Sequence, residues 1–129
     1  PAASLRTPFL DLGILPEAGS SLLMPRRMGH VRAFEMLALG ATFTAERMRE
    51  AGLVNAILPA TELEAIALNA AAVLAKKPRE ALMATRRLLR GDTAKILQRI
   101  DEEAEAFRQR LKSPEARAAF EGFLTKGCG

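Results

Sequence analysis

The spacing of apolar residues predicts amphipathic helices over most of the second half of the chain. Apolar side chains recur there every three or four residues, as on one face of a helix. An example is the stripe formed by Ile96, Ile100, Ala104, Phe107 and Leu111. Proline, glycine and small polar residues mark the helix ends. The expected boundary residues are Thr61, Pro78, Gly91, Asp92 or Thr93, Ser113 and Gly127.

Shorter helices are expected in the first half. Residues 20–28 can form a helix that Pro25 kinks or interrupts, and Gly29 separates it from a second helix over residues 30–39. Thr44 is a plausible N-cap for a helix over residues 45–51, which Gly52 would end. Together with the later segments, the pattern predicts five or six helices.

Two apolar runs are too short for helices and predict strands. Residues 9–15, broken by Gly13 and ended by Pro16, indicate a short buried strand or extended segment. Residues 53–58, closed by Pro59, indicate a second strand. Two short strands so far apart form a stable sheet only with further strands. We therefore expect the chain to be part of a larger α/β fold.

Composition limits the classes of partner. A chain of 129 residues, 49% of them hydrophobic, can bury one core of ordinary size. The net charge of +4 would admit nucleic acid, but acidic residues interleave with the basic ones and there is no Trp or Tyr for base stacking. The single Cys128, the lack of a long apolar run and the lack of a leader predict a soluble cytoplasmic protein that binds neither nucleic acid nor membrane.

One carboxylate stands out among few chemical signals. The chain has no glycine-rich phosphate loop and no metal-ligand spacing, and we expect no metal site; His30, the only histidine, suits a helix start. Glu17 lies between Pro16 and a small-residue turn, with apolar residues on both sides. It is either an acid that favours a helix N-terminus or a base held in a tight apolar setting.

Several segments, in order, resemble the crotonase superfamily of enoyl-CoA hydratases and isomerases. They are PFLDLGILPEAGSS at residues 8–21, RMGH at 27–30, LGATFTAE at 39–46, AGLVN at 51–55, TRRLL at 85–89 and SPEARAAF at 113–120. The resemblance covers nearly all of this chain but only about the C-terminal half of such an enzyme. It implies a ClpP/crotonase-like α/β fold, with residues 1–60 ending the spiral core and residues 61–129 forming a helical trimerisation region.

The resemblance also implies the chemistry. Family members stabilise the enolate of an acyl-CoA thioester with two backbone N–H groups, which are expected upstream of the residues matched here. This chain alone is therefore expected to be inactive. No separate cofactor is expected, because coenzyme A is part of the substrate. The expected partners are an acyl-CoA thioester in fatty acid metabolism and further copies of the protein in a homotrimer or hexamer.

The position of the base separates the family's reactions. Hydratases carry a catalytic glutamate just after the proline that Pro8 matches, but this sequence has Phe9 there, which cannot transfer a proton. In Δ3,Δ2-enoyl-CoA isomerases of the peroxisomal type, the single glutamate lies in a segment that matches residues 16–19. The resemblance therefore favours isomerisation with Glu17 as the base. A hydratase or lyase, or a non-catalytic helical assembly module, remains the alternative.

The C-terminal helices supply the other site residues that the resemblance implies. Phe107, Phe123 and Lys126 match positions near the adenine and phosphates of CoA, and Phe9 lines the acyl pocket. An apolar core stripe for the two phenylalanines and a helix C-terminal charge for the lysine remain equally open. The sequence departs from the family pattern at residues 127–129, where Gly-Cys-Gly replaces the usual basic extension.

Overall fold

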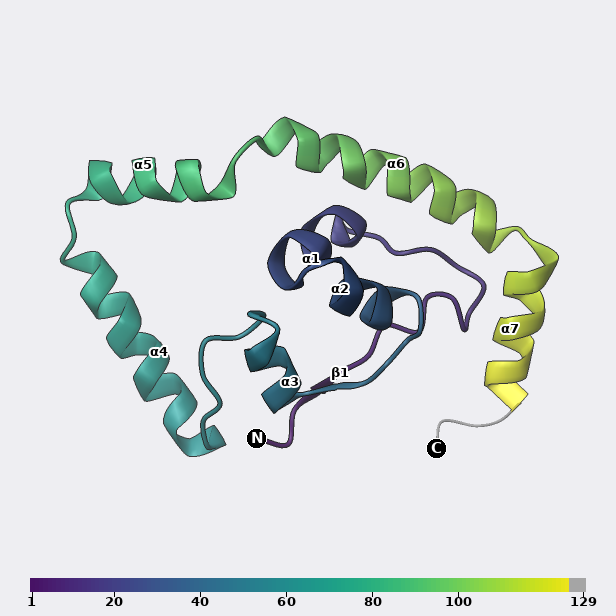
Figure 1. The fold of residues 1–129 in the computed structure, drawn as a ribbon, viewed down its shortest axis with the longest axis horizontal. Helices are drawn as coiled ribbons and strands as arrows, with labels where there is room; N and C mark the ends of the chain where they lie inside the picture. The colour runs from purple at the N-terminus through teal and green to yellow at the C-terminus, as the bar shows by residue number, and fades with distance from the viewer. Residues whose placement is uncertain (126–129) are drawn as a thin grey trace.

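The structure, a computed structural model, describes residues 1–125, which form seven helices and one two-stranded sheet (Figure 1). Helices α1, α2 and α3 form a compact centre with the sheet, and the remaining helices form an arc around it. The elements in chain order are β1 (Ser4–Leu5), α1 (Ser20–Met28), α2 (His30–Leu37), β2 (Phe43–Thr44), α3 (Ala45–Glu50), α4 (Ala60–Ala75), α5 (Arg79–Arg90), α6 (Thr93–Leu111) and α7 (Pro114–Thr125).

The core lies between α1, α2, β2 and α3. Its buried side chains are Met28, Ala33, Met36, Phe43 and Ala51. Met36 and Phe43 are each only 1% exposed, so they anchor this small core. The N-terminal segment joins it through the antiparallel pairing of β1 with β2, and the Thr7 hydroxyl donates to the Met36 carbonyl at 2.7 Å.

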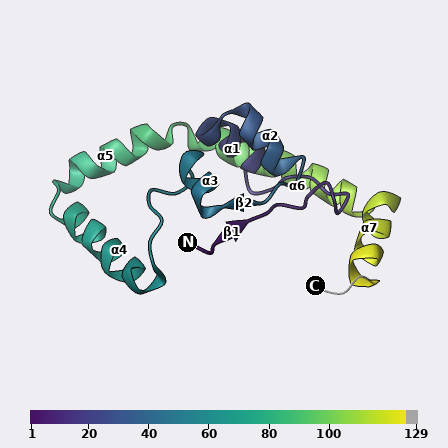
Figure 2. The ribbon, with the colours of Figure 1, turned by 60° about the horizontal axis from the view of Figure 1, so that its bottom comes forward.

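The arc leaves this core after α3. Helices α4 and α5 contain no buried residue, and many of their large apolar side chains are exposed. Helix α6 returns across α1, and α7 turns away from its end (Figures 1 and 2). In residues 1–125, no helix is both long enough and apolar enough to cross a membrane.

Both predicted strands are wrong. Residues 9–13 form successive turns, in which Leu12 N–H donates to the Pro8 carbonyl and Ile14 N–H to the Phe9 carbonyl, before an extended stretch without a partner strand. Gly13 has a φ of 67°, which breaks any regular strand there. Residues 53–58 are irregular. Leu53 packs against the core, whereas Val54 is 37% exposed, so the apolar run does not form a strand.

The predicted helix ends hold at most positions. Gly29 separates α1 from α2, Thr44 caps α3, Gly91 follows α5, and the Asp92 carboxylate accepts from Ala94 N–H at the start of α6. Two ends differ. Helix α2 stops at Leu37 rather than at residue 39, and α4 begins at Ala60, before the predicted cap Thr61. Gly127 lies outside the described residues, and the trimerisation role of the C-terminal helices stays a prediction.

Candidate functional site

Glu17 begins a tight turn that leads into α1. The Ser20 N–H donates to the Glu17 carbonyl at 3.0 Å, and the two central residues, Ala18 and Gly19, have positive φ angles of 59° and 77°. Positive φ at both central positions is the geometry of a type I′ turn. Ala18 is the one non-glycine residue in the described chain with positive φ, which costs about 1–2 kcal/mol. Something must therefore hold this turn in place.

That support comes from Glu103 on α6. Its Oε2 accepts the Gly19 N–H at 2.6 Å, and its Oε1 accepts the Ser21 N–H at 2.9 Å together with the Ser21 hydroxyl. Glu103 is only 7% exposed. Arg99 extends the network by donating to the Ser21 hydroxyl oxygen at 3.2 Å. A carboxylate on one helix thus caps the N-terminus of another.

The capping by Glu103 leaves no backbone donor at this helix start for Glu17. Ser20 N–H is taken by the Glu17 carbonyl and Leu22 N–H by the Gly19 carbonyl, while Glu103 takes the other two. The Glu17 side chain is exposed, and no hydrogen bond or ion pair to it occurs within residues 1–125. Any favourable interaction of the Glu17 carboxylate with this helix start is therefore electrostatic rather than a backbone hydrogen bond, and its role as the base stays a prediction. The described residues do not form the apolar enclosure expected around it, because only Ile14 among its apolar neighbours is fully buried.

A second contact fixes the other end of the segment. Arg110 Nε donates to the Gly13 carbonyl at 3.3 Å, and its guanidinium also pairs with Glu115 of α7. Glu103, Phe107 and Arg110 follow one another at four- and three-residue spacing, so they share one face of α6. Residues 13–19 therefore run along that face, tied down on both sides of Phe107.

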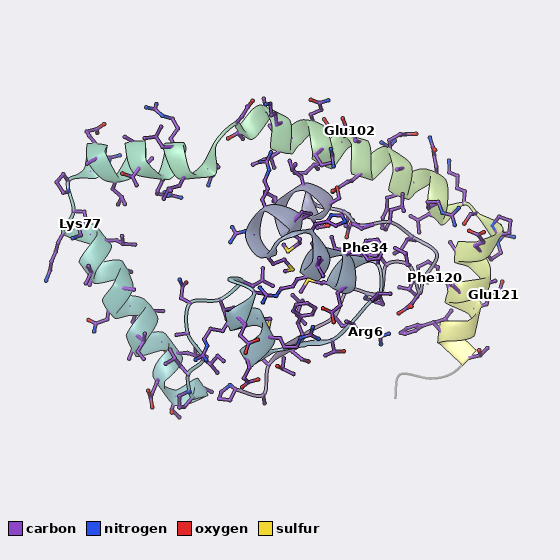
Figure 3. All side chains as sticks on the ribbon, viewed as in Figure 1. Arg6, Phe34, Lys77, Glu102, Phe120 and Glu121 are labelled. Carbon is purple, nitrogen blue, oxygen red and sulfur yellow. The ribbon has the colours of Figure 1, made fainter. Side chains whose placement is uncertain are left out.

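The other predicted site residues lie at separate places. Phe9 is half-buried in the turns at residues 9–13, and Phe107 is half-buried on the inner face of α6. Phe123 of α7 is 54% exposed. Figure 3 shows Phe120 on the side of α7 that faces the rest of the molecule and Glu121 on the opposite side. Lys126 lies outside the described residues. The roles of all these residues in binding CoA stay predictions.

Sequence reasoning missed Glu103. It lies in an acidic stretch with Asp101, Glu102 and Glu105, which resembles a solvated helix face. The sequence signal that could have identified Glu103 is its position on the helix. It follows Ile100 by three residues and precedes Phe107 by four, which places it in the apolar stripe. An acid in the apolar stripe of a helix needs buried donors, and the unfilled helix start at Gly19 supplies them.

The chain is similar to Enoyl-CoA delta isomerase 2 of Rattus norvegicus, 33% identical over 125 residues that cover 96% of this chain and 32% of the relative. It is also similar to the crystal structure of an enoyl-CoA hydratase/isomerase from Pseudoalteromonas atlantica T6c, with a TM-score of 0.91 and 29% identity over 98% of this chain and 51% of that chain.

A third similar protein is the enoyl-CoA hydratase from Bacillus halodurans, with a TM-score of 0.85 and 28% identity over 94% of this chain and 49% of that chain. The chain thus spans about a third of the rat relative and about half of the solved structures. These structures confirm the predicted crotonase fold class. A family model described as enoyl-CoA hydratase/isomerase matches residues 2–128, and the chain belongs to that family.

Proposed function

We propose that this chain is the C-terminal half of an acyl-CoA isomerase, in which Glu17 moves a proton between C2 and C4 of an enoyl thioester. The observation that carries the proposal is the state of Glu17. Glu17 is an exposed carboxylate on a turn that hydrogen bonds to Glu103 hold in place. Glu103 also already caps the helix N-terminus beside it. Similarity to a protein named enoyl-CoA delta isomerase 2 supports the same reading.

The reaction needs one base. Glu17 removes a proton from C2 of a 3-enoyl-CoA, and the electron pair moves onto the thioester oxygen to give a dienolate. The protonated Glu17 then returns the proton to C4, so that the double bond moves from C3–C4 to C2–C3. Two backbone N–H groups, which we place in the N-terminal half of the protein, stabilise the negative oxygen.

The position of Phe9 favours isomerisation over hydration. Adding water across the double bond in this family uses two carboxylates, and Phe9 occupies the place of one of them. A phenyl ring holds no transferable proton and instead offers apolar contact to an acyl chain. In the proposal, Phe107, Phe123 and Lys126 contact the CoA moiety, and the full-length protein assembles as a homotrimer or hexamer.

The second candidate is a hydratase or lyase that uses another base. What favours it is the similarity to a protein named enoyl-CoA hydratase, which is as extensive as that to the isomerase. A non-catalytic assembly module is the third, and the exposed apolar faces of α4 and α5 favour it. The three candidates differ in the substrate that the full-length protein turns over.

The test is an assay of the full-length protein with two substrates at equal chain length. One is a 3-enoyl-CoA, followed by the appearance of the conjugated thioester, and the other is a 2-enoyl-CoA, followed by its hydration. Isomerisation well above hydration supports the proposal. Hydration as the faster reaction favours the second candidate, and no turnover of either favours the module. The 129-residue chain by itself should turn over neither, because each absent oxyanion donor costs about 10²–10³ in rate.

A further inference from the structure

We propose that Glu103 is a positioning residue for the reaction, which fixes the direction of Glu17 by holding the turn at residues 17–20. The proposal rests on the proposed function of Glu17. Glu103 does not touch the substrate. It acts through the backbone of Gly19 and Ser21, which lie two and four residues after the base.

The conformation of the turn explains how Glu103 can act on the position of Glu17. Ala18 and Gly19 both have positive φ angles, and an alanine leaves that region readily when nothing opposes it. The Gly19 N–H is held at 2.6 Å by a buried carboxylate, so the peptide between Ala18 and Gly19 cannot rotate without breaking a charge-assisted hydrogen bond. If that peptide were released, Ala18 could leave the positive-φ region, and the rotation about its N–Cα bond would change the direction of Glu17 relative to α1.

The site requires a carboxylate rather than any polar side chain. Three donors converge on the two oxygens of Glu103, one on Oε2 and two on Oε1. In Glu103→Gln, an amide NH2 must take the place of one oxygen and would oppose the Gly19 N–H or the Ser21 donors. The substitution keeps the size of the side chain but removes at least one of these bonds.

The proposal is tested by a double-mutant cycle in the full-length protein. The kcat and KM for 3-enoyl-CoA isomerisation are measured for wild type, Glu103→Gln, Glu17→Gln and the double variant, together with each variant's urea unfolding. Glu105→Gln is the matched control, because Glu105 lies on the same helix, is exposed and, among residues 1–125, pairs only with the nearby Arg108 and Gln109 of that helix.

We expect Glu103→Gln to lower kcat about 10- to 100-fold with little change in KM, as for a misplaced catalytic group. In the Glu17→Gln background the same change should lower kcat no further, because there is no base left to misplace. The loss of stability should be the same in both backgrounds. Glu105→Gln should match wild type in all three measurements.

Two outcomes overturn the proposal while leaving the proposed function intact: an unchanged kcat in Glu103→Gln, or an equal loss of kcat in both backgrounds, which would show a purely structural role. If Glu17→Gln itself leaves kcat unchanged, the base assignment fails and the positioning role fails with it. Should Glu103→Gln not fold, Ser21→Ala removes one of the three bonds to Glu103. It should lower kcat about two- to fivefold only when Glu17 is present, and an unchanged kcat overturns the proposal.

Discussion

Gly13 and Ala116 are in backbone contact, although they lie on the N-terminal turn and on α7. A Cβ atom on Gly13 would lie 2.9 Å from both the Cα and the backbone nitrogen of Ala116, which is itself fully buried. Only a glycine therefore lets α7 dock beside the segment that leads to Glu17. The backbone at Gly13 is thus fixed by two contacts, this close approach to Ala116 and the hydrogen bond from Arg110 to the Gly13 carbonyl.

Gly13→Ala should therefore destabilise the full-length protein by about 2–4 kcal/mol. The positive φ of 67° contributes one part of the loss and the clash with the α7 backbone the other. Urea unfolding measures the change. The matched control is Gly52→Ala, since Gly52 has a similar φ of 73° and its added Cβ would lie 3.6 Å from the nearest neighbouring atom, the Arg27 carbonyl oxygen, an ordinary contact distance. Equal losses for the two variants would show that the contact with Ala116 contributes nothing.

Thr44→Ala should lower the free energy of unfolding by about 1 kcal/mol, because the Thr44 hydroxyl accepts the Arg47 N–H at the start of α3. The control Thr42→Ala changes an exposed residue two positions earlier and should be neutral. Urea unfolding of both variants at neutral pH distinguishes the cap from a general effect of losing a threonine. A neutral Thr44→Ala would show that the cap does not stabilise the fold.

The same position predicts a pH dependence. The backbone N–H of Glu46 and then the Thr44 hydroxyl hold the pKa of Glu46 below its ordinary value. Because the folded pKa is lowered, this stabilisation is present above the unfolded pKa of about 4.3 and is lost as the pH falls through the folded pKa. Thr44→Ala should raise the Glu46 pKa and so reduce the loss of stability between about pH 6 and about pH 3. An NMR titration of the Glu46 carboxyl that shows no shift would contradict this.

The 129-residue chain by itself should self-associate. Helices α4 and α5 bury none of their residues, and their large apolar side chains are left in water, which a monomer rarely tolerates. They include Leu63, Leu68, Val73, Leu88 and Leu89. Light scattering at tens of micromolar should show dimers or trimers, and the variant carrying Leu88→Glu and Leu89→Glu should shift toward monomer. A clean monomer for the unmodified chain would contradict the prediction.

Helices were predictable here because their signals are local. Asp92, Ser113 and Thr44 each cap the helix that follows through their own side chains, and Gly29 and Gly91 stop the helices before them. The strands were not predictable, since Ser4–Leu5 and Phe43–Thr44 are two residues each and exist only through pairing between residues 38 and 40 positions apart. The apolar run at residues 9–15 instead forms turns in which Ile14 is buried and Gly13 contacts α6 and α7.

The candidate site also has one part that was predictable from the sequence and one part that was not. Glu17 stood out because proline and a small-residue turn surround it in the sequence. Glu103, which supports the turn after Glu17, did not stand out, because it lies 84 positions from Gly19 and among other acidic residues. No local pattern connects a carboxylate on one helix with the bare N-terminus of another; only the fold brings them together.

The most direct test of the account is the kcat of Glu17→Gln in the full-length protein. The amide is nearly isosteric, so KM and the free energy of unfolding should stay close to wild type, while the isomerase kcat falls by roughly 10²–10⁴. Phe9→Ala is the comparison variant, because it opens the apolar side of the site without removing the proton-transfer group. If Glu17→Gln leaves the isomerase kcat unchanged and instead lowers the free energy of unfolding by about 1 kcal/mol, Glu17 is a helix-end acid and not the base.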